Sequence, residues 1–362
     1  MDLMLKLRPS FFFSFLIFIF LLQKPNLGSA SSPKCISTER QALLTFKQSL
    51  TDPSGRLSSW SRPDCCKWRG VCCDRRTSYV IKIDLRNPNQ TLRRNGEFRN
   101  GSLGGKIHPS LTRLKFLSYL DLSSNDFNFT EIPEFVGHIV SLRYLNLSFS
   151  SFSGEVPASF GNLSKLESLD LYAQTLPLSL PSSANLKLLE VLDLSRNYFY
   201  SPTPNWLFDL TSLRKLFLQL VRLQGSISPG FKKLKLLETL DLSKNELSGE
   251  IPAVLGDLPR LKNLHILDLS ENKLSGSVPK CMGNLTAITL DLSRNRFSGA
   301  IPQSLAAISS LHTLNVSYNK LEGSIPKQLK FKDPSIYAGN ELLCGKPLSK
   351  KCARKQQDVV VN

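Results

Sequence analysis

Apolar and polar residues follow each other along most of the chain in a pattern that repeats about every 24 residues. One unit is LETLDLSKNELSGEIPAVLGDL, Leu237–Leu258, with apolar residues at positions 1, 4, 6, 11, 15, 19 and 22, Asn at 9, Gly at 13 and Pro at 16. A weaker copy begins at Val80, and further units begin at Leu117, Leu142, Leu166, Leu189, Leu213, Leu237, Leu264, Ala287 and Leu311. Self-similarity over so many copies predicts a repeat architecture.

The alternation around position 5 predicts one short strand in each unit. Leu240 and Leu242 would point to one side of this strand, and Asp241 and Ser243 to the other. One unit cannot bury its own leucines, so we expect the units to stack and to form a parallel sheet that lines a concave surface. The carboxamide at position 9 is expected to bond the backbone where the chain turns. It is supplied by Asn125, Asn197, Asn245, Asn272, Asn295 and Asn319.

Residues 1–30 have the layout of a secretory signal peptide. Lys6 and Arg8 precede the apolar run Phe11–Leu22, and the small residues Gly28–Ala30 follow it as a cleavage site. The apolar run is shorter than the roughly 20 residues that cross a bilayer. We therefore expect a secreted protein that does not span a membrane once the signal is removed.

We divide the rest of the chain into an N-terminal cysteine-rich cap at 31–79, the repeats at 80–331, and a C-terminal cap with a basic tail at 332–362. In the first cap, Thr38 and Gln41 have the spacing of a helix capping box. An apolar stripe of helical period follows, formed by Ala42, Leu43, Phe46 and Leu50. Caps of this kind cover the leucines that the end repeats would expose.

The eight cysteines allow two interpretations, because paired cysteines can bind a metal or form disulfides. A secretory signal places them in an oxidising route, which favours disulfides, and we expect no metal site. The expected bridges are Cys35–Cys65 and Cys66–Cys73 in the first cap and Cys344–Cys352 in the second. Cys72 and Cys281 are then either free thiols or paired with each other.

The formal net charge of +17 changes the range of expected partners. Residues 1–30 carry three basic residues and one acidic residue, so the chain that follows them has a charge of +15. Outside a cell, this excess favours contact with polyanions such as wall pectate or an anionic membrane surface. A secreted chain without a recognised binding motif is not expected to bind nucleic acid.

Several longer motifs resemble those of plant extracellular leucine-rich-repeat receptor-like proteins, the class that includes receptors for fungal ethylene-inducing xylanase. They are ERQALLTFKQSL, DCCKWRGVCCD, GKIHPSLTRLKFLSYLDLSSN, the repeated GxIP, and GNELLCGKPL with the later KKC. The resemblance implies an α/β leucine-rich-repeat solenoid, curved and right-handed, with a parallel β-sheet on its concave face and disulfide-bonded caps. Members of this class commonly have more repeats and a membrane helix, so the chain resembles a shortened member. It is also similar to polygalacturonase-inhibiting proteins, which are secreted and have a comparable number of repeats.

Acidic residues recur at position 5, namely Asp84, Asp121, Asp170, Asp193, Asp241, Asp268 and Asp291. A glycoside hydrolase needs two carboxylic acids with different environments in a cleft, and a regular row of equivalent acids does not supply them. We interpret the row as structural, with its charge balanced by hydrogen bonds from neighbouring side chains. His265 and His312 lie two units apart, too far for a shared metal. We therefore predict no enzyme activity and no cofactor.

The candidate ligand-binding residues are those that differ from the repeat consensus on the exposed side of the strands. Phe217 replaces the usual Asp, for example, and Tyr172 replaces the usual Ser. Aromatic and basic side chains in a face of small polar residues are typical of binding hot spots, although sequence drift at sites without a packing role gives the same pattern. The seven candidates are Tyr144, Phe149, Tyr172, Arg196, Lys215, Phe217 and Leu220.

Seven Asn-X-Ser/Thr sequons are expected to carry glycans in a secreted protein. They begin at Asn89, Asn100, Asn128, Asn146, Asn162, Asn284 and Asn315. Asn146 and Asn315 both fall at position 5 of a strand. Glycans there would screen both ends of the sheet and confine a ligand to its middle.

Together these features predict an extracellular recognition module that binds a protein or peptide ligand on its concave face, in plant defence or receptor signalling. A membrane receptor kinase is the expected signalling partner. Two alternatives stay open: an inhibitor of a microbial cell-wall-degrading enzyme, or a shortened product without activity of its own. The expected location is the apoplast or cell wall, or the exterior of the plasma membrane through a partner.

Overall fold

The computed structural model describes residues 35–88, 101–176, 185–252 and 264–352. They belong to one compact unit, Lys34–Asn362. The expected signal peptide, the sequons at Asn89 and Asn100, and the last ten residues of the tail lie outside the described residues. No helix in the described ranges is long and apolar enough to cross a lipid bilayer.

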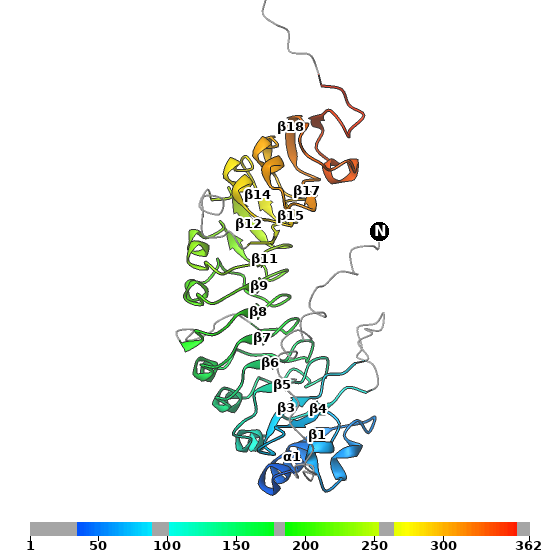
Figure 1. Cartoon of the computed structure of the whole chain (residues 1–362), viewed down its shortest axis with the longest axis vertical. Coiled ribbons are helices and arrows are strands. Elements are labelled where there is room, and N and C mark those ends of the chain that lie inside the picture. Colours follow the sequence, from blue (N-terminus) through cyan, green and yellow to red (C-terminus); the bar gives the residue numbers. More distant parts are fainter. Residues whose placement is uncertain (1–34, 89–100, 177–184, 253–263, 353–362) are drawn as a thin grey trace, which may run out of the picture. The chain divides into compact units, whose positions relative to one another are not determined.

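Consecutive coils of this unit stack in chain order, and each contributes one strand to a large sheet (Figure 1). Ten strands are parallel, and β2 pairs antiparallel with β3 at the N-terminal end. The predicted parallel sheet is therefore confirmed. Its strands are β2 (Val71–Cys73), β3 (Val80–Asp84), β5 (Tyr119–Asp121), β6 (Tyr144–Asn146), β7 (Ser168–Asp170), β8 (Val191–Asp193), β9 (Lys215–Phe217), β11 (Thr239–Asp241), β13 (Ile266–Asp268), β15 (Thr289–Asp291) and β17 (Thr313–Asn315).

The register of this sheet places equal unit positions side by side. Leu240 pairs with Leu216 on one side and Leu267 on the other, so position 4 forms a continuous apolar row. The first residue of every unit from Val80 to Leu311 is buried, including Ala287. A single apolar core runs from the first cap to the second, as stacking of incomplete units requires.

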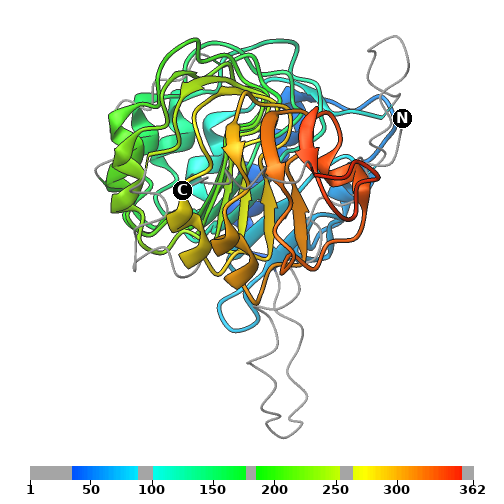
Figure 2. The ribbon, with the colours of Figure 1, turned by 90° about the horizontal axis from the view of Figure 1, so that it is seen from above.

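The return half of each coil contains short helices and further strands. Most coils carry one 3-10 helix of about one turn, and the coils overlap when the unit is viewed along the stack (Figure 2). The helices are η6 (Pro109–Arg113), η7 (Glu134–His138), η8 (Ala158–Asn162), η10 (Asn205–Asp209), η11 (Pro229–Lys233), η13 (Lys280–Asn284) and η14 (Gln303–Ala307). The caps contain η4 (Ser58–Ser61), η5 (Cys65–Lys67) and η15 (Pro334–Tyr337).

Within the described residues, three small sheets accompany the large one, and the sequence pattern does not predict them. In two of them, extended segments at positions 10 to 14 of neighbouring coils pair in parallel. In the third, Leu50–Thr51 of the N-terminal cap pairs antiparallel with Gly104–Gly105. Gly249 at position 13 has a φ of +77°, which a residue with a Cβ rarely adopts. The strands are β1 (Leu50–Thr51) with β4 (Gly104–Gly105), β10 (Gln224–Gly225) with β12 (Glu246–Gly249) and β14 (Lys273–Leu274), and β16 (Ser298–Ala300) with β18 (Lys320–Ser324) and β19 (Leu342–Cys344).

The asparagines at position 9 bond the backbone of two coils, as the sequence predicts. The Asn245 Nδ2 donates to the carbonyls of Leu242 and Ser243 in its own coil and to that of Leu218 in the preceding coil. Its Oδ1 accepts from the backbone N–H groups of Val221 and Leu223. The other five predicted asparagines make equivalent bonds, and Asn340 extends the row into the C-terminal cap.

Both caps contain the expected disulfides. Cys35 is bonded to Cys65, Cys66 to Cys73, and Cys344 to Cys352. Helix α1 (Ser37–Ser49) buries Ala42, Leu43 and Phe46 of the predicted stripe. The predicted capping box is wrong, because Ile36 is the N-cap residue and Thr38 already lies inside the helix, where no side chain caps the first turn.

Replacing Asn245→Ala should lower the free energy of unfolding by about 3 kcal/mol, because it leaves several buried backbone groups without a hydrogen-bond partner. Chemical denaturation followed by far-UV circular dichroism measures the change. Asn205→Ala is the matched control, since Asn205 is exposed at the start of η10. Equal stability of the two variants would contradict the proposed role of the row.

Candidate ligand-binding face

The exposed side of the large sheet is built from positions 3, 5 and 7 of each unit together with position 8, which follows the strand; we call it the sheet face. Position 8 has a left-handed backbone in every unit from Leu117 onwards. Its φ lies between +52° and +60° in Ser124, Phe149, Ala173, Arg196, Leu220, Lys244, Glu271, Arg294 and Tyr318. This conformation costs a residue with a side chain about 1 kcal/mol. In six of these nine units an asparagine at position 9 bonds the backbone of the turn, and Ser150, Gln174 and Val221 take its place in the other three.

Two stacked tyrosines occupy the sheet face near its N-terminal end. The rings of Tyr119 and Tyr144 are nearly parallel, with centroids 4.1 Å apart, and the Lys82 Nζ lies 4.0 Å from the Tyr119 centroid. The Tyr119 hydroxyl donates to Asp121 at 3.3 Å. Burial raises the pKa of both phenols, to about 12 for Tyr144, so both are neutral donors at physiological pH. Tyr119 is absent from the sequence candidates, although it shares position 3 with Tyr144.

Phe149, Tyr172 and Arg196 come from three successive coils and contact one another. The Phe149 and Tyr172 rings have centroids 4.7 Å apart, and the Arg196 guanidinium carbon lies 5.7 Å from the Tyr172 centroid. Tyr172 was expected on the exposed side, but only 3% of it is accessible. It therefore forms the floor of the group, while Arg196 is exposed and Phe149 half-buried.

The remaining candidates lie on or directly after strand β9. Phe217 stands in register between Asp193 and Asp241, so a half-buried ring interrupts the acidic row at position 5. Lys215 occupies position 3 of the same strand and is also half-buried. Leu220 is 44% exposed. The structure thus gathers an aromatic and a basic side chain on one strand, with an apolar one beside them.

Acidic residues occupy three consecutive strands towards the C-terminal end of the sheet face. Asp268 is in register between Asp241 and Asp291. Burial, followed by the negative charge of Asp241, raises the pKa of Asp268 to about 7, although hydrogen bonds from Ser270 oppose the shift. The interpretation of the row as structural agrees with these bonds, because the serine at position 7 donates to the carboxylate at position 5 in several units.

Within the described ranges, one group of three potential metal ligands has donor atoms close enough to share an ion. It consists of the sulfurs of Cys35, Cys65 and Cys66, all of which belong to disulfides. Disulfide sulfurs offer no thiolate, and thiolate is the form of cysteine that binds metals. Cys72 lies outside the three bridges and is exposed.

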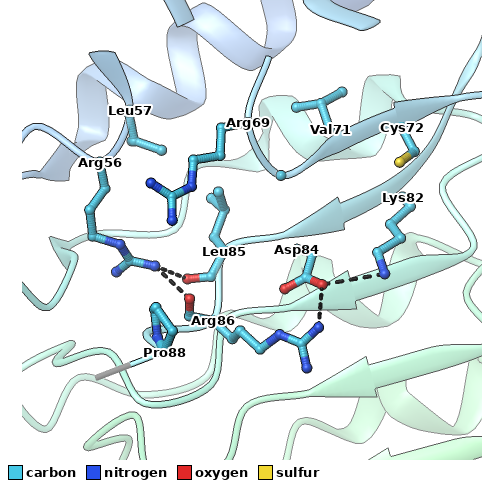
Figure 3. A pocket seen from close by; sticks show the side chains of 11 residues that line it. Arg56, Leu57, Arg69, Val71, Cys72, Lys82, Asp84, Leu85, Arg86 and Pro88 are labelled. Atoms are coloured by element: carbon cyan, nitrogen blue, oxygen red, sulfur yellow. Dashed lines mark hydrogen bonds and ion pairs between the residues drawn. The ribbon is translucent and has the colours of Figure 1, made fainter. Parts of the chain in front are cut away.

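A hollow of about 350 Å³ adjoins the N-terminal end of the sheet face (Figure 3). We call it the basic hollow, because Arg56, Arg69, Lys82 and Arg86 line it together with a single carboxylate, Asp84. Asp84 Oδ2 lies 2.9 Å from Arg86 and 3.3 Å from Lys82. The sequence does not reveal this site, because two of its arginines, Arg56 and Arg69, come from the cap and meet the sheet only in the folded chain.

Five of the seven sequons lie in the described residues. Asn128, Asn162 and Asn284 are exposed, the last two at the ends of η8 and η13. Asn146 and Asn315 are half-buried on the sheet face, in strands β6 and β17. The Asn146 Nδ2 donates to the Tyr144 hydroxyl, and the Asn315 Nδ2 donates to Asp291.

Comparison with known families gives matches over much of the repeat region. Residues 36–74 match the Leucine rich repeat N-terminal domain. The Leucine Rich Repeat family matches six further segments, residues 141–163, 188–210, 236–258, 263–285, 288–308 and 310–331. These segments coincide with coils of the observed stack.

Among curated relatives, the chain is similar to Receptor-like protein EIX1 of Solanum lycopersicum. The two are 43% identical over 187 residues, which is 50% of this chain and 18% of the relative. The chain thus aligns with less than a fifth of this relative's length.

Two solved structures share the fold over most of the chain. A plant ice-binding protein is 32% identical, with a TM-score of 0.76 and coverage of 89% of this chain and 99% of that chain. The ectodomain of the Arabidopsis receptor kinase HAESA, in complex with an extended IDA peptide hormone, is 29% identical, with a TM-score of 0.63 and coverage of 84% and 57%. A further HAESA structure contains IDA and the co-receptor SERK1.

Asp268→Asn should remove part of the pH dependence of stability. Because the pKa of Asp268 is raised in the folded state, its stabilising effect is complete below about pH 4 and is lost as the pH rises to about 7. Asparagine fits this position, as Asn146 and Asn315 show. At pH 8, the free energy of unfolding measured in urea should be about 2 kcal/mol higher for the variant than for the wild type. This difference should shrink towards pH 4.

Asp74→Asn should change the pH dependence of stability in the opposite direction. Hydrogen bonds, first from the Thr77 hydroxyl and then from the Thr77 and Arg76 N–H groups, lower the pKa of Asp74. Its contribution is therefore present at neutral pH and is lost as the pH falls below about 4. Unchanged pH profiles in the Asp268 variant would show that the acidic row is not coupled to folding.

Glycan mapping of the secreted protein by mass spectrometry should find Asn146 and Asn315 occupied. Glycans at these positions would cover parts of β6 and β17 and leave the strands between them open. The exposed Asn162 and Asn284 serve as internal positive controls. Occupancy of the controls with bare Asn146 and Asn315 would remove the idea that glycans confine the ligand.

Proposed function

We propose, on the premise that the chain belongs to the leucine-rich-repeat family, that it is an extracellular recognition module that binds a protein or peptide ligand on its sheet face. The main observation in support is the group of aromatic and basic side chains on that face, centred on Phe217 and on the contacts of Tyr172 with Phe149 and Arg196. In the proposed role it binds and does not catalyse.

The physical basis is the contrast between these residues and the rest of the face. Most units present Asp, Asn, Ser or Thr at positions 5 and 7, which water solvates well. Phe217 and Phe149 are half-buried rings at the surface, and covering them with a ligand removes apolar area from water. Arg196 adds a guanidinium beside Tyr172, and Arg and Tyr are enriched in interface hot spots.

The comparisons support the kind of ligand. HAESA binds a peptide hormone in its complex, and the related structure adds a co-receptor. We extend both features to this chain: a peptide or protein ligand, and a membrane receptor kinase as signalling partner. The similarity to Receptor-like protein EIX1 supports a receptor-like role. We extend it to a role in plant defence, with the protein in the apoplast, in the cell wall or at the outer surface of the plasma membrane.

A second candidate is ice binding, favoured by the plant ice-binding protein that this chain covers almost completely. The assay is inexpensive. If the protein binds ice, the purified chain at micromolar concentration should inhibit ice recrystallisation. If a surface other than the sheet face contacts the ice, the sheet-face variants described below should inhibit it equally well.

The main test is capture of ligands by the secreted full chain from a panel of microbial wall-degrading enzymes and plant receptor-kinase ectodomains, with enzyme activity assayed in parallel. The double variant Lys215→Thr with Phe217→Asn restores residue types found elsewhere in these rows, so it should fold normally. It should bind a captured ligand at least tenfold more weakly, since hot-spot side chains each contribute about 2 kcal/mol.

The control is Thr313→Ala, at position 3 of the last strand, which should leave affinity unchanged. Binding without inhibition, together with capture of a receptor-kinase ectodomain, supports recognition. Binding with inhibition would replace this proposal by the enzyme-inhibitor function. Absence of any ligand would favour a shortened product without activity of its own.

A further inference from the structure

The basic hollow is continuous with the sheet face. Lys82, Asp84 and Arg86 occupy positions 3, 5 and 7 of the first unit, and Lys82 and Asp84 pair in register with Tyr119 and Asp121 of the next strand. An elongated ligand lying across the strands would reach the hollow at the N-terminal end of the face.

The charges that line the hollow are not balanced. Asp84 is the single carboxylate of the lining, and it already contacts both Lys82 and Arg86. Within the described residues, no hydrogen bond or ion pair occupies the Arg69 guanidinium, whose side chain extends into the hollow beside Arg56 (Figure 3). Four cations thus line the hollow with one carboxylate, and two carboxylates outside the lining also act on them, Asp52 on Arg56 and Asp121 on Arg86, so the local charge stays positive.

Arg56 has a structural role and keeps this arrangement rigid. It donates to the carbonyls of Leu85 and Arg86 at 2.7 Å and to the Asn125 Oδ1 at 2.8 Å, so it joins the cap to the first coils. Burial lowers the pKa of Arg56, and the neighbouring Arg69 charge lowers it further, against the effect of Asp52. Two guanidinium groups thus lie close enough to repel each other, and an anion beside Arg69 would relieve this repulsion.

The backbone also holds Arg69 close to the strand. The Asp84 N–H donates to the Gly70 carbonyl at 2.7 Å. Gly70 has a φ of +84°, and a Cβ on it would lie 2.4 Å from the Asp84 carbonyl oxygen. This close approach fixes the residue next to Gly70 over the end of the sheet, so Arg69 is placed before any ligand arrives.

We propose that the basic hollow binds a carboxylate at one end of the peptide ligand, with Arg69 and Arg86 as the donors. Planar guanidinium groups match the geometry of a carboxylate and bond it more strongly than neutral donors do. The hollow, at about 350 Å³, has room for a carboxylate and the residue that carries it. This inference rests on the proposed peptide-binding function of the sheet face.

The first experiment tests the hollow without a peptide. Malonate is added at constant ionic strength, with chloride as the reference salt, and thermal unfolding of the full chain is followed. Malonate at 10 mM should raise the Tm of the wild type by about 2 °C. The double variant Arg69→Gln with Arg86→Gln should lose the shift. Arg75→Gln with Arg76→Gln removes the same charge from an exposed turn of the cap and should keep it.

Absence of a malonate shift in the wild type, or an equal shift in both double variants, would overturn the hollow as a carboxylate site whatever the sheet face binds. The Tm of each variant without malonate reports whether it folds. Arg56 is left unchanged in all variants because of its structural bonds.

The second experiment uses fluorescein-labelled octapeptide mixtures that differ only in a free or amidated C-terminal carboxylate. The free form should bind the wild type about tenfold more tightly, and the Arg69/Arg86 variant should remove the difference. If the Lys215/Phe217 variant loses all peptide binding but keeps the malonate-induced rise in Tm, the sheet face and the basic hollow act as separate sites. Equal binding of free and amidated mixtures would overturn the proposal. Tight binding of sodium polygalacturonate that depends on Arg69 and Arg86 would replace the peptide by an acidic polysaccharide.

Discussion

A leucine of one coil reaches full burial only because the next coil covers it, and the rest of the structure depends on this constraint. Leu240 has no accessible surface, and it lies between equivalent leucines of the two neighbouring coils. Asn245 adds the polar counterpart, because it bonds carbonyls of its own coil and of the coil before it. Stability therefore lies largely between coils, and the outward positions of the strands lie outside the apolar core, although some of them, such as Asp121 and Tyr172, are still buried.

The same bonds also shape the turn that borders the sheet face. Position 8 adopts a left-handed backbone in all nine units from Leu117 onwards, although none of the nine residues is glycine. In six of these nine units the next residue is an asparagine that bonds the backbone of the turn, as Asn197 does after Arg196, whereas Ser150 follows Phe149 and Val221 follows Leu220. Phe149, Arg196 and Leu220 all occupy this position, so the same turn conformation presents all three side chains, and preformed contacts of this kind would lose less conformational entropy on binding the proposed ligand.

Rules that act within one unit were predictable from the sequence, and contacts between units were not. The parallel strands, the asparagine row and the disulfide-bonded caps follow from residue types at fixed spacing. Tyr172 departs from its predicted exposure because Phe149 and Arg196 of the adjoining coils cover it. The small flanking sheets and the basic hollow also form between segments distant in sequence. Tyr119 could have been found, since it repeats the position of Tyr144 in the preceding unit.

The distribution of charge along the sheet face gives it a direction. Arg69 and Arg86 lie at the N-terminal end, whereas Asp241, Asp268 and Asp291 occupy adjacent strands towards the other end. An elongated ligand with one carboxylate end gains attraction in one orientation and meets like charge in the other. Burial already holds Asp268 near its titration range at neutral pH, so a second negative charge beside it is especially unfavourable. The rows of the repeat are symmetric in shape, so under the proposed function the substitutions within them would select the orientation of a peptide ligand.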